Sequence, residues 1–167
     1  MDGVCQDRPR PERIGPVVHV KVVIRLREEA LQSVQESASV YRQLAAEVPA
    51  AFRDALAARL NNLGVVQASM GLFEEALQCT LEAVSLRRQL AAEEPEAFLP
   101  ALATSLGNLG NRRSALGQLD EALQCALEAV FLRRKLAANN TEEFLTDLAA
   151  SLSNLSNVQH LMGLSLE

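Results

Sequence analysis

Apolar residues recur along the chain at the spacing of an amphipathic helix. Leu102, Leu106, Leu109 and Leu116 follow one another at intervals of four, three and seven residues, which places them on one helical stripe. Two other segments carry a similar stripe, at Leu56, Leu60, Leu63 and Val66 and at Leu77, Leu81 and Val84. A strand would alternate instead, so the pattern predicts an all-α fold.

The helical segments repeat with a period of 46 residues. Residues 75–92 read EALQCTLEAVSLRRQLAA and residues 121–138 read EALQCALEAVFLRRKLAA, and a fainter copy occupies residues 29–46. A second type of segment repeats at the same period, at 51–71, 97–117 and 143–163. The unit is therefore expected to be two helices of about 20 residues each.

Glycine and proline mark the expected helix ends. Gly71, Gly117 and Gly163 are the last residues of the second type of segment, where a left-handed glycine closes a helix at low cost. Pro49 and Pro95 stand where the next helix begins, a position that tolerates a missing N–H. Links this short predict that successive helices run antiparallel.

The spacing of small residues resembles the tetratricopeptide repeat family. Leu60-x-x-Leu63-Gly64 is followed by Ala76 and Ala83, and the same residue types recur one unit later at Leu106, Leu109, Gly110, Ala122 and Ala129. The glycine and the first alanine allow the two helices of a hairpin to touch, and the second alanine allows hairpins to stack. The unit departs from the common pattern by its length of 46 residues and by Ser156 at the third glycine position, and it is similar to the long repeats of kinesin light chains.

The resemblance implies a right-handed α-solenoid of antiparallel hairpins over residues 28–163, with about six helices. Residues 1–27 hold six basic and three acidic residues and a β-branched stretch. An extended strand and a strained helix are both open for that stretch, and we favour a short irregular basic segment. Residues 164–167 are expected to form a tail. Because both ends are expected to expose apolar helix faces, our hypothesis is that the chain is a fragment, an alternative product or a self-associating module.

Composition narrows the classes of function. The net charge of −5 argues against a nucleic-acid partner, and no apolar run is long enough for a membrane helix. Cys5, Cys79 and Cys125 form no metal-binding or disulfide pattern. Cys79 and Cys125 are interpreted as packing residues. Scattered free thiols favour a reducing, intracellular compartment for the protein. No catalytic motif is present, and His19 and His160 lack ligand spacing, so we expect neither an enzyme nor a cofactor.

The candidate binding residues lie on the second type of segment, which lines the concave groove in tetratricopeptide arrays. Asn62, Asn108 and Asn154 recur at 46-residue spacing, and each carboxamide can donate to and accept from the backbone of a bound segment. The alternative is that these residues are a surface consensus of the repeat. Neighbouring candidates on the same helices are Asn61, Asn111, Asn157, Arg112 and Arg113.

The two arginines at 112 and 113 would pair with an acidic side chain or a terminal carboxylate, or else lie solvated on the surface. The repeated pairs Arg87-Arg88 and Arg133-Arg134 are interpreted as solvated charges near helix C-termini. The expected function is a protein-interaction scaffold that binds a protein or peptide partner in its groove. The alternative is a structural or oligomerisation fragment of a larger signalling protein, which associates through uncapped ends.

Overall fold

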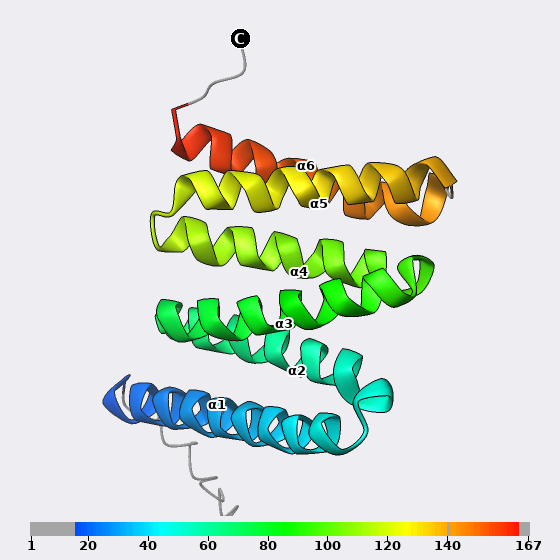
Figure 1. Ribbon diagram of the computed structural model, residues 1–167. Coiled ribbons are helices and arrows are strands. Elements are labelled where there is room, and N and C mark those ends of the chain that lie inside the picture. Colours follow the sequence, from blue (N-terminus) through cyan, green and yellow to red (C-terminus); the bar gives the residue numbers. More distant parts are fainter. Residues whose placement is uncertain (1–15, 140, 164–167) are drawn as a thin grey trace, which may run out of the picture.

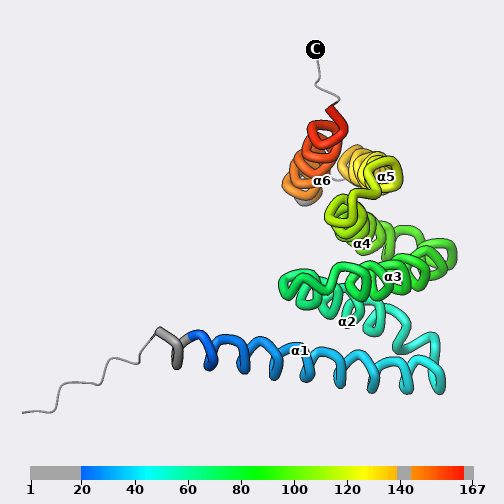
Figure 2. Tube along the Cα trace, turned by 90° about the vertical axis from the view of Figure 1, so that its left-hand side faces the viewer, coloured from blue at the N-terminus to red at the C-terminus, as the bar shows by residue number. Residues whose placement is uncertain are grey.

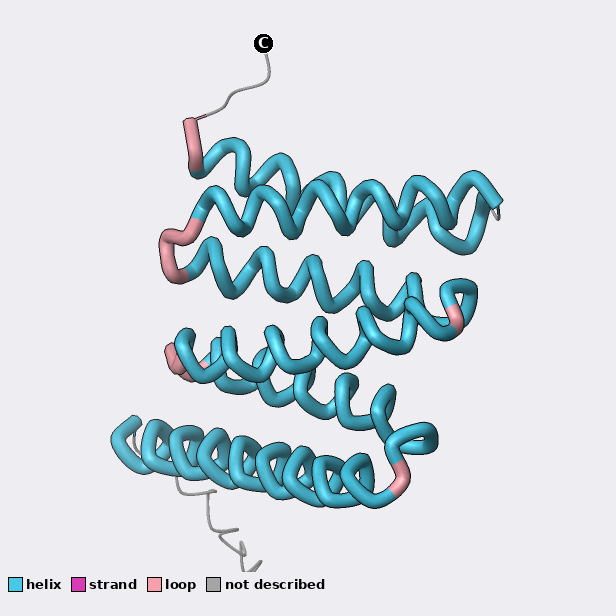
Figure 3. Tube along the Cα trace, viewed as in Figure 1, coloured by secondary structure: helices cyan, strands magenta, loops and turns pink. Residues whose placement is uncertain are grey.

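The repeat is helical throughout the part of the chain that the computed structural model describes, residues 16–139 and 141–163 (Figure 1). Six helices fill those ranges, joined by short links, and no strand occurs in them (Figure 3). This confirms the all-α prediction. The helices are α1 (Pro16–Glu47), α2 (Pro49–Ser69), α3 (Phe73–Glu93), α4 (Pro95–Ala115), α5 (Leu119–Asn139) and α6 (Thr141–Leu161).

The helix ends follow the glycine and proline pattern. Pro49 and Pro95 open α2 and α4, and Gly71, Gly117 and Gly163 have φ angles of 79°, 73° and 71°. After α2, the Gly71 N–H donates to the Ala68 carbonyl at 3.1 Å and the Leu72 N–H donates to the Gln67 carbonyl at 3.0 Å. These two bonds form a Schellman motif, which satisfies the last carbonyls of the helix.

Each helix packs against the helices before and after it, so the chain forms a stack that runs from α1 to α6 (Figures 1 and 2). The stack has two unequal sides. Within the described residues, α4 also approaches both α2 and α6, whereas no Cα atom of α1, α3 or α5 lies within 8 Å of a Cα atom of another of these three helices. The even-numbered helices therefore lie closer together than the odd-numbered ones.

Small residues permit the closest approaches between helices. A Cβ atom built on Gly64 would lie 3.1 Å from the Ala76 carbonyl oxygen, and one on Gly110 would lie 3.4 Å from the Ala122 carbonyl oxygen. Leu60 and Leu106, which precede these glycines by one turn, are completely buried. The predicted role of glycine and alanine at the hairpin crossings is confirmed. One apolar cluster joins α1, α2 and α3, and a second joins α3, α4 and α5.

The N-terminal part of the described chain corrects the prediction of an irregular segment. Residues 16–27 are helical and continuous with the rest of α1, whereas residues 1–15 and the expected tail at 164–167 lie outside the described ranges. β-Branched residues lower helix propensity by only a few tenths of a kcal/mol, and extending an existing helix avoids the cost of nucleation. Since α1 has 32 residues and α2 has 21, its first turns project beyond the stack (Figure 2).

Candidate functional site

Two of the repeated asparagines line one small cavity. Asn108 on α4 and Asn154 on α6 share a cavity of about 170 Å³ with Arg133 from α5. Gly107 also lines the cavity, and a Cβ atom at that position would lie 3.6 Å from the Asn154 Nδ2 atom, an ordinary contact distance. The structure therefore brings two carboxamides and a guanidinium to one place between α4 and α6.

Arg133 is buried beneath this cavity, with 5% of its surface exposed. Its Nη1 atom donates to Oδ2 of Asp147 at 2.5 Å, and its Nη2 atom donates to Oγ1 of Thr104 at 2.6 Å. Burial lowers the pKa of Arg133, and the Asp147 carboxylate opposes that shift. Because a guanidinium titrates far above neutral pH, the cavity keeps a fixed cation, held by one carboxylate that is itself half exposed.

Arg87, one unit earlier, occupies an equivalent buried place. Its Nη1 atom donates to the Ala101 carbonyl at 2.9 Å and to Oγ of Ser105 at 2.8 Å. Its Nε atom lies 3.5 Å from Oδ1 of Asp54, and burial lowers the pKa of Arg87. The interpretation of Arg87 and Arg133 as solvated charges was wrong, because each one joins its own helix to the two even-numbered helices beside it.

In the first unit the arginine at this crossing lies on the even-numbered helix instead of the odd-numbered one. Tyr41 occupies the position of Arg87 and Arg133, and the cation comes instead from Arg59 on α2. The Arg59 guanidinium lies 5.5 Å from the centre of the Tyr41 ring, within the range of a cation–π contact. Ser105 and Ser151 occupy the position of Arg59 in the later units. Each unit therefore places one arginine at this crossing, on one helix or the other.

Ion pairs connect the odd-numbered helices, although the backbones of these helices do not touch. Arg42 donates to Glu82 at 2.6 Å, and Arg88 donates to Glu128 at 2.6 Å, 46 residues later in both partners. We call this repeated Arg–Glu pairing the charge ladder. It was missed from the sequence because the partners are 40 residues apart, whereas helical ion pairs are sought at three or four.

The remaining candidate asparagines divide between surface and interior. Asn62, Asn111 and Asn157 are exposed on α2, α4 and α6. Asn61 is 7% exposed, and its Nδ2 atom donates to Oγ of Ser105 at 2.7 Å, so its amide links α2 to α4 inside the fold. Asn61 is therefore unsuited to contact a partner directly.

The two candidate arginines on α4 differ in their surroundings. Arg112 is partly buried, and this burial lowers its pKa. Arg113 lines a cavity of about 380 Å³ together with α3 and α5, and its Nη1 atom lies 3.5 Å from Gln118 Oε1 and 3.6 Å from Glu121 Oε1. Arg113 therefore faces the odd-numbered helices and does not join the cavity that contains Asn108.

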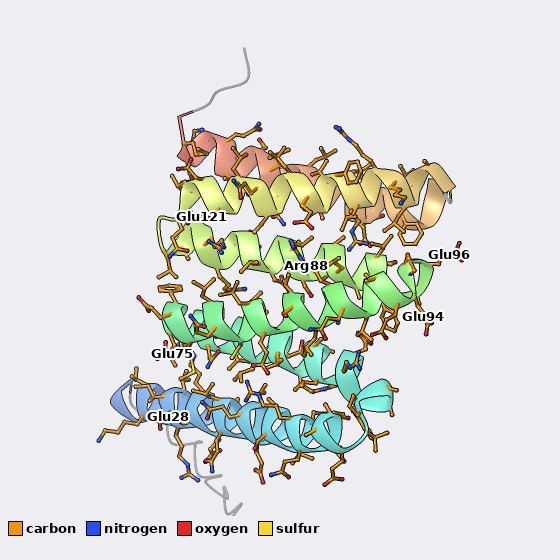
Figure 4. The ribbon with its side chains drawn as sticks, in the orientation of Figure 1. Glu28, Glu75, Arg88, Glu94, Glu96 and Glu121 are labelled. Carbon is orange, nitrogen blue, oxygen red and sulfur yellow. The ribbon has the colours of Figure 1, made fainter. Side chains whose placement is uncertain are left out.

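The other charged groups and the thiols considered next stabilise the helices or pack in the interior. Glu75 and Glu121 lie on the same side of the stack, in the first turns of α3 and α5, where they favour the helix dipole (Figure 4). Cys79 and Cys125 are buried, and burial raises the pKa of both thiols, which keeps them protonated. These two cysteines pack among apolar side chains, whereas Cys5 lies outside the described residues.

Comparison with protein-family models gives no match, and no curated protein matches the sequence. In the described residues, every helix is too short or too polar to cross a membrane. The repeat and the geometry given above are therefore the basis for a functional assignment.

Proposed function

We propose that this chain is a tetratricopeptide-like protein-interaction scaffold, folded as a right-handed α-solenoid, which binds a partner segment without catalysing a reaction. The 46-residue repeat and the close approaches at Gly64 and Gly110 support the family assignment. The partner is an extended or helical segment of another protein. It lies along the face formed by α2, α4 and α6, which we call the even face.

The even face is the inner side of the stack in this proposal. In a curved helical stack, the helices on the inside of the curve lie closest together. The approaches of α4 to α2 and to α6, with no such approaches among α1, α3 and α5, are the arrangement expected for that curvature. A concave surface can surround a bound segment on several sides, which favours peptide binding.

The shared cavity of Asn108 and Asn154 is the observation that carries the proposal. Each carboxamide offers two donors and one acceptor, so two of them on neighbouring helices can satisfy successive peptide groups of a bound backbone. Asn62 continues the series on α2 and is exposed. Apolar contacts are available from Val65 and Leu161, which are 47% and 58% exposed.

A triple substitution tests the role of the asparagine column. Asn62, Asn108 and Asn154 are replaced together by Ala, and the variant and the wild-type chain are used to capture partners from native lysate for mass spectrometry. Losing three hydrogen-bonding groups, each contributing about 0.5–1.5 kcal/mol, should weaken a captured partner by roughly tenfold to a thousandfold. Circular dichroism should remain unchanged.

The chain supplies a matched control. Gln32, Gln78 and Gln124 are exposed carboxamides at the same 46-residue spacing, but they lie on α1, α3 and α5. Their triple replacement by Ala should leave capture and affinity at the wild-type level. Equal affinity in the asparagine variant, or equal losses in both variants, would exclude the even face as the binding surface.

A further inference from the structure

The last helix exposes positions that the equivalent helices bury. Leu60 on α2 and Leu106 on α4 are 0% exposed, whereas Leu152, at the same place on α6, is 38% exposed. Ser156 is exposed too, and it occupies the position of Gly64 and Gly110. In the first two units this face is covered by the odd-numbered helix that follows, so α6 presents a surface shaped to receive such a helix.

The first helix shows the complementary face. Ala76 on α3 and Ala122 on α5 are completely buried against the even-numbered helices that precede them. Their equivalent on α1 is Ala30, which is exposed. Within the described residues, no helix precedes α1 in the stack, so the face that α3 and α5 turn toward an even-numbered helix is open on α1.

We propose that α6 of one copy packs against α1 of a second copy, as α2 packs against α3 and α4 against α5 within the chain. The helices α1 to α6 comprise three units of 46 residues, so the second copy continues the repeat with an offset of 138 residues. In this register Ser156 of one copy faces Ala30 of the next, as Gly64 faces Ala76 and Gly110 faces Ala122.

The charge ladder indicates that the open face of α6 is covered by another copy of this chain. Its two internal pairs join an arginine to a glutamate 40 residues later, Arg42 to Glu82 and Arg88 to Glu128. The next arginine is Arg134, and the offset of 138 residues places Glu36 of the second copy at the expected position of its partner. Both side chains are exposed, and no ion pair of either is present among the described residues.

The size of the facing side chains sets the strength of this interface. Ser156 is larger than Gly110, and Val34 of the second copy takes the place of Ala126. The spacing between α4 and α5 still leaves 3.4 Å between a Cβ atom on residue 110 and the Ala122 carbonyl oxygen, which is ordinary contact. The Ser156 hydroxyl and the larger Val34 side chain add atoms beyond that Cβ, so the interface between copies is wider and weaker than those inside the chain, and Ser156→Gly should tighten it.

Such an interface is heterologous, because the two copies contribute different faces. Each added copy leaves one α1 face and one α6 face open, so assembly proceeds head to tail into chains or closes into a ring. It does not stop at a dimer with two-fold symmetry. This association uses the ends of the stack and is independent of partner binding on the even face.

Charge reversal tests the register of the two copies. Sedimentation velocity is measured over a wide range of concentration for wild type, Arg134→Glu, Glu36→Arg and the double variant. Each single reversal replaces an attractive pair with a repulsive one and should weaken association by roughly threefold to thirtyfold. The double variant restores opposite charges across every interface and should associate as wild type does. A mixture of the two single variants should also assemble.

Lys135→Glu is the control for net charge. Lys135 is exposed beside Arg134 but does not belong to the charge ladder, so its reversal should leave association unchanged. Ser156→Gly should strengthen association, as measured in the same way. A wild-type chain that stays monomeric at all concentrations would overturn the proposal. Equal effects of Arg134→Glu and Lys135→Glu, or a double variant that is not restored, would overturn the register.

Discussion

At the level of single residues, the two glycines at the hairpin crossings have different surroundings. A Cβ atom on Gly64 would lie 2.8 Å from Oγ1 of Thr80, whereas the nearest atom to one on Gly110 is 3.4 Å away. The difference comes from the facing residue, which is Thr80 in one unit and Ala126 in the next. The threonine hydroxyl is buried and donates to the Ala76 carbonyl at 2.8 Å, so it cannot move without losing that bond.

We therefore predict opposite effects of alanine at the two glycines. Gly64→Ala should lower the free energy of unfolding by about 1–2 kcal/mol, because overpacking outweighs the gain in helix propensity. Gly110→Ala should leave it unchanged or raise it by up to about 1 kcal/mol. Urea unfolding followed by circular dichroism measures both. Adding Thr80→Ala to the Gly64 variant should recover part of the loss, and equal losses at both glycines would contradict this account.

Buried polar residues show why the sequence predicts the fold better than the site. The stripes at Leu56 and Leu102 report burial against an immediate neighbour, and they located the helices. The burial of Arg87 and Asn61 depends instead on Ser105, which lies on α4 and receives hydrogen bonds from both. A helical stripe contains no information about a partner one unit away. The recurrence of the Arg–Glu separation in successive units was the available signal for the charge ladder.

At the level of the helices, each even-numbered helix ends in a backbone conformation that favours glycine. Gly117 has a φ angle of 73°, and a Cβ atom there would meet no other atom within 4 Å. Any cost of a side chain at this position is therefore backbone strain rather than a clash. The turn directs the chain from α4 into α5, and the Gln118 N–H closes it by donating to the Arg113 carbonyl at 2.9 Å.

A graded series at Gly117 tests this reasoning. Gly117→Ala should lower the free energy of unfolding by about 1–2 kcal/mol, the cost of a left-handed conformation for a residue with a Cβ atom. Gly117→Asn should cost less, because asparagine enters this region more readily. Thermal unfolding at fixed protein concentration gives both values. An alanine variant as stable as wild type would show that the turn relaxes into another conformation.

At the level of the whole molecule, stability is distributed along the stack. Each helix contacts mainly its neighbours in sequence, as in other quasi-one-dimensional repeat proteins. The first turns of α1 extend beyond α2 and carry exposed apolar residues, with Val20, Ile24 and Leu26 each about half exposed. The prediction of irregular structure for this part was wrong about conformation, because β-branched content reports propensity and not continuity with a stable helix.

Hydrogen exchange should separate the two parts of α1. Residues 20–26 are exposed except for the partly buried Val23, so little packing protects their amides, whereas those near Ala38 lie in the cluster shared with α2 and α3. The former should exchange at least about tenfold faster, corresponding to roughly 1.4 kcal/mol less in opening free energy. The measurement is made at a protein concentration where the chain is monomeric. Equal protection along α1 would indicate that another segment covers its first turns.

The reversed arrangement of Tyr41 and Arg59 has a consequence for recombination of the units. The matched positions 41 and 59, 87 and 105, and 133 and 151 each lie on an odd-numbered helix and the even-numbered helix that follows. A chimera cut at the Gly71 or Gly117 turn keeps every matched pair together. A cut at Val48 or Glu94 can instead join α3 to α2, which brings the guanidiniums of Arg87 and Arg59 to one buried crossing. The glycine turns are thus the recombination points at which units of this chain can be duplicated, deleted or shuffled without separating these pairs.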